Sequence, residues 1–241
     1  MRVPLLCADC IRAERLPAEC TVYATANDTG IYEICCRAGH KSIVVLAATR
    51  HEQLFELGLS AITDQYFREA VSSFSAALER FYEFSTAVLA QSAGVKSDAF
   101  DLAWKHVARQ SERQLGAFVA AHLFVEGLSP AILPPKAVEF RNEVVHKGKF
   151  PSQAEALQFG DEVLSVIRPT LSAMKARHPV ALEAQWLKPH RKALESPQLV
   201  GKPLTSHYPS MTLRNFELEA ASGKDTRHYV WLFGVRHGHS Q

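Results

Sequence analysis

Apolar residues in the middle of the chain recur at steps of three and four, the spacing that places side chains on one face of an α-helix. This pattern runs from residue 50 to about 195 and predicts a series of helices. The clearest segment predicts a long helix with an apolar stripe made of Phe67, Val71, Phe74, Leu78 and Phe81. A weaker pattern predicts a last helix over about 180–195. We therefore expect the middle of the chain to be α-helical.

Capping and turn residues divide this region into separate helices. Ser97 can cap one of them. Residues 111–114 (Ser-Glu-Arg-Gln) and 152–155 (Ser-Gln-Ala-Glu) each have the form of a capping box, which satisfies the first backbone N–H groups of a helix. Between them, prolines interrupt the chain and a new helix begins at about Pro135. That helix is expected to end at Gly148, since Gly with a following Pro is typical of helix termination.

The two ends of the chain have a strand-like pattern. Short β-branched or aromatic runs at residues 21–24, 31–34 and 42–46 predict strands, and residues 27–30 (Asn-Asp-Thr-Gly) predict a hairpin between the first two. Near the other end, residues 196–210 contain three prolines and predict an extended connector. Residues 211–219 and 227–235 then predict two strands of a C-terminal β-hairpin.

Composition and charge limit the class of protein. The 241 residues are 47% hydrophobic and 22% charged, as expected of a folded protein with a real core. The formal charge of +2 gives no overall basic field, so a nucleic-acid surface would have to be local. The N-terminus has no apolar run long enough for a signal peptide, and no stretch approaches the length of a membrane-spanning helix. We expect a cytoplasmic protein that does not contact a membrane.

The cysteines are confined to the first 36 residues, which in a cytosolic chain favours metal binding over disulfides. Cys7 and Cys10 have the spacing of two thiolates that reach one Zn²⁺. Cys36 and His40 are the second pair, because Gly39 permits the tight turn that would bring the imidazole back to the thiolate. These four residues predict a structural Zn²⁺ site that resembles a zinc ribbon. The alternative is a metal-free core.

Cys35 is the competitor for the third ligand position. Successive side chains on a strand point to opposite faces, so only one of Cys35 and Cys36 can be a ligand, and we choose Cys36 for its spacing to His40. Cys35 and Cys20 are then expected to be ordinary small residues.

Arg141, Asn142 and His146 carry the candidate chemistry of the helical region. Asn142 and His146 are four residues apart and share a helix face, with Arg141 one step round from them. His titrates near neutrality and suits general acid–base catalysis, while the Arg fork stabilises charge on a phosphate. These residue types suit cleavage of RNA by its own 2′-OH. A solvent-facing helix end is the alternative. Glu79 or Glu83 could hold Arg141 in place, or could instead pair with Arg80.

The arrangement resembles the HEPN superfamily, which carries an Arg-x4–6-His motif in a helical domain, with a polar residue directly after the Arg. The resemblance covers roughly residues 63–178 and includes the long helix, the helix with Arg141, Asn142 and His146, and a long closing helix. It implies a metal-independent endoribonuclease acting on RNA in defence, stress or toxin activity. It also implies a homodimer in which both Arg/His sets line one composite site. The alternative is a non-catalytic module for RNA or nucleotide binding or dimerisation, with the zinc ribbon recruiting a partner.

These observations together predict a mainly α protein. We expect a small N-terminal β zinc ribbon over residues 1–48, a HEPN-like helical bundle over residues 50–195, and a connector with a short C-terminal β-hairpin over residues 196–241.

Overall fold

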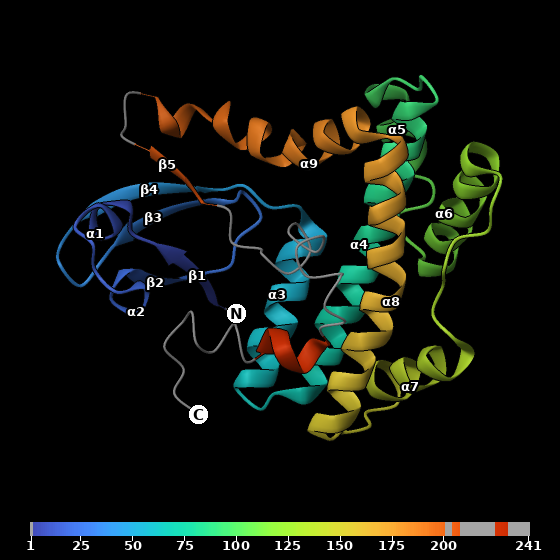
Figure 1. Cartoon of the computed structure of the whole chain (residues 1–241), viewed down its shortest axis with the longest axis horizontal. Coiled ribbons are helices and arrows are strands. Elements are labelled where there is room, and N and C mark those ends of the chain that lie inside the picture. The colour runs from blue at the N-terminus through green and yellow to red at the C-terminus, as the bar shows by residue number, and fades with distance from the viewer. Residues whose placement is uncertain (1, 201–203, 208–224, 231–241) are drawn as a thin grey trace.

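The computed structural model describes residues 2–200, 204–207 and 225–230, and it is mainly helical (Figure 1). The predicted long helix is α4 (Phe67–Ser92). Its apolar stripe is buried except for the half-buried Phe67 at the start, with Val71, Phe74 and Phe81 fully shielded from solvent. Six more helices of the middle region are α3 (Arg50–Thr63), α5 (Ser97–Trp104), α6 (Ser111–Glu126), α7 (Pro135–His146), α8 (Gln153–Arg177) and α9 (Pro179–Leu194).

Helix α4 lies at the centre of the helical region. Helices α3, α6, α7, α8 and α9 all contact it, and α4 and α8 run side by side. The core between them is rich in aromatic rings; those of Phe55 and Phe74, for example, have centroids 4.8 Å apart. In the described part of the chain, none of the helices has the length and apolarity needed to cross a membrane. The proposed division into residues 1–48, 50–195 and 196–241 stays a prediction.

Two capping predictions for these helices are wrong and one is confirmed. Ser152 caps α8, because its hydroxyl oxygen accepts a hydrogen bond from the backbone N–H of Glu155. In return, the Glu155 carboxylate accepts a hydrogen bond from the backbone N–H of Ser152 at 2.8 Å. Ser97 and Ser111, in contrast, are the first residues of α5 and α6, after the N-cap positions Lys96 and Gln110. The Ser111 hydroxyl donates instead to Glu79 of α4, so a tertiary partner replaces the local cap.

The described strands form a two-stranded sheet of β1 (Arg2–Leu6) and β2 (Thr21–Thr25), and a three-stranded sheet of β3 (Ile31–Cys35), β4 (Lys41–Leu46) and β5 (Leu204–His207). The three N-terminal strands predicted from sequence are present. Strand β1 was not predicted, and its antiparallel pairing with β2 shows that the predicted hairpin through residues 27–30 is wrong. Asn27 Oδ1 accepts from the N–H groups of Thr29 and Gly30, so this segment turns the chain from one sheet to the next.

The sheets are joined to the helices through β4. Strand β4 pairs antiparallel with β3 and parallel with β5. Its Ile43 and Val45 pack with Ala193 at the end of α9 and with Leu199 of the 3-10 helix η1 (Pro197–Leu199). As Figure 1 shows, α9 extends from the helical region to cover this side of the sheet.

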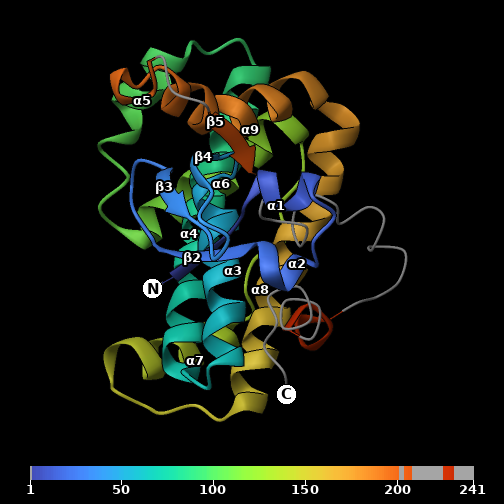
Figure 2. The ribbon, with the colours of Figure 1, turned by 90° about the vertical axis from the view of Figure 1, so that its left-hand side faces the viewer.

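The C-terminal prediction is wrong where it can be compared. Residues 226–230 are helical and lie beside α8 (Figure 2), although a strand was expected over 227–235. The Asp161 carboxylate accepts the Thr226 N–H, and the buried Tyr229 ring joins the main core with its hydroxyl 2.7 Å from Arg168. These contacts with α8 favour a helical turn over a strand. The other expected strand, residues 211–219, lies outside the described residues. Strand β5 and η1 occupy part of the expected connector.

Gly58 of α3 provides a test of how closely α3 and α4 pack. A Cβ atom at this position would lie 2.4–2.9 Å from the Phe74 ring. Gly58→Ala should therefore lower the free energy of unfolding by about 1–3 kcal/mol through overpacking, measured by urea denaturation. Gly116→Ala on α6 meets open space and is the control; it should stabilise by roughly 0.5–1 kcal/mol. Equal stability of both variants would contradict the close approach.

Candidate functional site

A short helix brings the side chains of Cys7 and Cys10 close together. Cys7 is the N-cap of α1 (Ala8–Arg12) and Cys10 lies within that helix. A hydrogen bond of 2.8 Å from the Cys7 N–H to the Cys20 carbonyl fixes this helix to the end of α2 (Pro17–Cys20). Both thiols are buried.

Cys36 and His40 lie at the two ends of the turn that joins β3 to β4. The Gly39 N–H donates to the Cys36 carbonyl at 2.9 Å, and the Cys36 N–H donates to the His40 carbonyl at 3.1 Å. Gly39 has a φ of +83°, which residues with a Cβ rarely adopt. The tight turn expected from the sequence is therefore present. It joins the two strands of a β3–β4 hairpin, whereas the sequence had predicted the hairpin between β2 and β3.

The structure brings all four predicted ligands together. Their ligand atoms lie within 4.8 Å of one another. His40 Nδ1 is 3.4 Å from both Cys10 Sγ and Cys36 Sγ and 3.7 Å from Cys7 Sγ, and the Cys10 and Cys36 sulfurs are 3.6 Å apart. A tetrahedral ion with metal–sulfur bonds of about 2.3 Å separates such atoms by roughly 3.5–3.8 Å. The cluster is thus compatible with a metal ion.

The electrostatics of the thiols differ within this cluster. Burial, together with the neighbouring Cys36 and Cys7 thiols, raises the pKa of Cys10 to about 12. Burial opposes ionisation of Cys36 as well, but the backbone N–H groups of His40 and Ala38 donate to its sulfur and lower its pKa to about 6. Three thiols at this separation can be thiolates together only when a cation balances their charge.

The remaining cysteines lie outside the cluster. Cys35 is exposed and Cys36 is buried in the cluster, as strand alternation required. Cys20 is buried nearby, and its thiol donates to the Arg15 carbonyl. Burial raises the pKa of the Cys20 thiol.

Arg141 is held in a fixed orientation on α7. Its Nε donates to Ser75 Oγ at 2.9 Å and its Nη2 to Glu79 Oε1 at 2.7 Å, so two residues one turn apart on α4 bind it. Its Nη1 donates to Asn142 Oδ1 at 3.0 Å. A guanidinium has five N–H donors. The two donors that remain can bind a phosphate while the other three hold the side chain in place.

The two acidic candidates on α4 have separate partners. Glu79 pairs with Arg141, and Glu83 pairs with Arg80 at 2.6 Å, so each of the two expected arrangements occurs once. Glu79 also accepts from Ser111, and Arg80 donates to the buried Gln114 amide at 2.7 Å. Sequence reasoning missed Ser75, Ser111 and Gln114. Ser75 and Glu79 could have been found as two polar positions one turn apart beside an apolar stripe.

His146 ends α7 and is exposed to solvent. Within the described part of the chain no hydrogen bond joins its imidazole to Arg141, Asn142 or another residue. Gly148, with a φ of +76°, ends the helix as predicted, and the Lys149 N–H returns to the Glu143 carbonyl. The structure therefore brings Arg141 and Asn142 into contact and leaves the His146 ring open to a ligand or to another chain.

Comparisons with known proteins do not place this site in a family. No protein-family model matches the sequence, and neither a curated protein nor a solved structure shows significant similarity to the chain. The chemistry of the site therefore follows from the residues and contacts described above.

Metal content should separate Cys36 from Cys35. Protein produced in zinc-supplemented medium should contain about one metal ion per chain by elemental mass spectrometry, and Cys36→Ser should lose most of it because a ligand is missing. Cys35→Ser is the matched control, since this neighbouring thiol is exposed and outside the cluster. Loss of metal from Cys35→Ser alone, or metal-free wild-type protein, would contradict the assignment.

Proposed function

We propose that the chain is a metal-independent endoribonuclease of HEPN type, with Arg141, Asn142 and His146 at its active site. The observation that carries the proposal is the anchoring of Arg141. Among the described residues, a guanidinium held by Glu79, Ser75 and Asn142 keeps two N–H donors free, on the same helix as an exposed imidazole. Fixed positioning by a second helix is what a donor to a phosphate needs in order to act in the transition state.

The proposed reaction uses the 2′-OH of the RNA as the nucleophile. The 2′-oxygen bonds to the adjacent phosphorus as its proton passes to a base, and the bond from phosphorus to the 5′-oxygen breaks as that oxygen takes up a proton. Imidazole suits either proton transfer because it titrates near neutral pH. Arg141 would donate to the phosphate oxygens, which gain charge in the transition state. Asn142 orients Arg141 through its side-chain oxygen.

A second copy of the chain would complete the site. One imidazole cannot accept the first proton and donate the second in the same step, so two His146 residues facing one cleft suit the reaction better than one. Large apolar side chains are exposed close to α7 in the sequence. They are Leu123 and Phe124 on α6, Leu128 and Ile132 in the following loop, and Val138 on α7. Exposed apolar residues of this kind support a homodimer interface at this side of the molecule.

The metal site would be structural. We propose that Cys7, Cys10, Cys36 and His40 bind Zn²⁺, because three thiolates and an imidazole match the ligands that zinc prefers. Four protein ligands fill a tetrahedral shell and leave no position for a substrate. The ion would then hold α1 to the β3–β4 turn and contribute to folding. By resemblance to the HEPN superfamily, we propose a defence, stress or toxin role. We also propose a cytoplasmic location, as expected from the apolar pattern of the sequence.

Cleavage of RNA tests the active site. Zinc-loaded protein in a magnesium-free buffer, with EDTA added only to the reaction, should cleave total RNA. His146→Ala should slow cleavage by about 10²–10⁴-fold and Arg141→Ala by about 10²–10³-fold, because each removes a group used in the transition state. Lys147→Ala, which removes an exposed charge next to His146, is the control and should change the rate by less than about tenfold.

Two other results of the cleavage assay would argue against this active site or this activity. Cleavage that persists in both His146→Ala and Arg141→Ala would contradict the site. RNA binding without cleavage by the wild type would favour the non-catalytic RNA-binding module. That alternative is supported by one observation, namely that no hydrogen bond joins the His146 imidazole to Arg141 or Asn142 within the described chain.

The homodimer predicts a mass near 54 kDa, twice the 26.8 kDa of the chain, by light scattering at micromolar concentration. Phe124→Ser should shift the mass toward the monomer, because this ring is 84% exposed in the single chain and would lose apolar burial in the dimer. Leu102→Ser on α5, also exposed, is the control and should leave the mass unchanged. A strict monomer that still cleaves RNA would contradict a composite site.

A further inference from the structure

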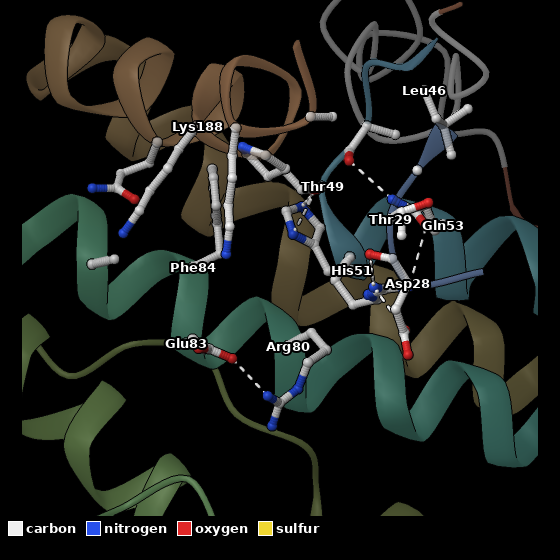
Figure 3. Close-up of a pocket in the computed structure, with 18 of the residues that line it drawn as sticks. Asp28, Thr29, Leu46, Thr49, His51, Gln53, Arg80, Glu83, Phe84 and Lys188 are labelled. Carbon is white, nitrogen blue, oxygen red and sulfur yellow. Dashed lines mark hydrogen bonds and ion pairs between the residues drawn. The ribbon is translucent and has the colours of Figure 1, made fainter. Parts of the chain in front are cut away.

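A cavity of about 740 Å³ lies where the β-sheets meet the helices, and the proposed reaction does not use it. Figure 3 shows Arg80, Glu83 and Phe84 on α4 along one side of it and Lys188 on α9 across from them. His51 and Thr49 lie between these two sides, at the start of α3. A cavity of this size at a junction of structural layers is typical of a small-molecule site.

The charged side chains of the cavity leave an excess of positive charge. Three cations of the lining are each paired with a carboxylate that also lines it: Arg50 with Asp28 at 3.0 Å, Arg80 with Glu83 at 2.6 Å, and Lys188 with Asp101 at 3.0 Å. The fourth cation, Lys192, has no ion-pair partner within the described residues. Solvent-exposed ion pairs contribute little free energy, so an incoming anion can compete for their cations.

Lys188 and Lys192 form the most direct anion-binding feature of the cavity. They are one turn apart on α9, which places both ammonium groups on the same face of the helix, and both line the cavity. Lys188 also donates to Ser97 Oγ at 3.0 Å, so its side chain is already directed across to α5. Two ammonium groups one turn apart suit the several oxygens of one phosphate.

Another part of the lining is apolar and aromatic. Phe84 is buried and Phe100 is half-buried, and both contribute to the cavity wall. His51 packs 4.7 Å from Phe84, and burial lowers the pKa of its imidazole to about 3. The ring is therefore neutral at pH 7 and extends the aromatic wall without adding charge. Such a wall suits a flat, apolar ring system.

We propose that this cavity binds a nucleoside monophosphate, with the phosphate held by Lys188 and Lys192 and the base against Phe84 and Phe100. The site is separate from Arg141 and His146 and does not depend on ribonuclease activity. The two regions are adjacent on α4, because Arg80 lines the cavity and the preceding residue, Glu79, binds Arg141.

Isothermal titration of the full-length, zinc-loaded chain tests the proposal. The probes are AMP, GMP and UMP, with adenosine and inorganic phosphate supplying the two parts separately. At least one nucleotide should bind with one site per chain and more tightly than either part. Lys192→Ala should weaken that binding by about tenfold or more, the effect of one lost charge-assisted contact. Arg191→Ala is the matched control, since this exposed cation is the next residue of α9 but does not line the cavity.

The competing outcomes each overturn the proposal. Failure of all three nucleotides to bind, or equal binding by adenosine alone, would exclude a phosphate site. If inorganic phosphate bound as tightly as the nucleotides, the base would make no contribution and the aromatic wall would not be part of the site. Unchanged affinity in Lys192→Ala, with thermal unfolding matching the wild type, would place the nucleotide elsewhere. Loss of binding in Arg191→Ala as well would show a general charge effect.

Discussion

Burial of the apolar faces of α4 is the constraint on which the rest of the structure depends. Phe74, Phe81 and Val88 are fully buried along this helix, and six other helices of the described chain contact it. Burying side chains of this size contributes about 1.5–3 kcal/mol each, so α4 fixes the positions of its neighbours. Its polar residues are thereby held in place as well. Both candidate sites use them.

Successive residues of α4 serve the two sites. Glu79 binds Arg141 and Ser111, while Arg80 binds Gln114 and the cavity residue Glu83. Gln114 is buried, and its amide donates to the Ala108 carbonyl as well as accepting from Arg80, so its polar atoms are satisfied. The start of α6 is therefore bound to α4 by polar contacts that also position the candidate catalytic arginine.

The N-terminal sheets are attached to this framework through β4 and α9. Ile43 and Val45 of β4 pack on Ala193 and Leu199, and the cavity lies beside this contact. The cluster of Cys7, Cys10, Cys36 and His40 is at the other end of the sheet, between α1 and the β3–β4 turn. A metal ion there would stabilise the hairpin that carries β4, which gives the cluster a structural role in placing the sheets against α9.

Sequence patterns correctly predicted the elements that are determined by residues close together in the chain. The stripe from Phe67 to Phe81, the helix from Pro135 and the turn at Gly39 follow from periodicity or from φ restrictions, and the structure contains them. Features that depend on distant partners were missed. Strand β2 pairs with β1 because Arg2–Leu6 supplies its hydrogen bonds, Ser111 is used by Glu79, and residues 226–230 are helical against α8. The mainly helical structure and the cluster of Cys7, Cys10, Cys36 and His40 were predictable. For Arg141, the sequence offered Glu79 as one of two possible partners, whereas the Ser75 contact had to be observed.

Analysis of the RNA products tests the central claim most directly. If His146 and Arg141 promote attack by the 2′-OH, mass spectrometry should find a 2′,3′-cyclic phosphate on one product and a 5′-hydroxyl on the other. A substrate with a single 2′-deoxynucleotide at the cleaved position should resist cleavage there. Products with 5′-phosphate ends, or cleavage of the 2′-deoxy substrate at the unchanged position, would contradict the proposed function.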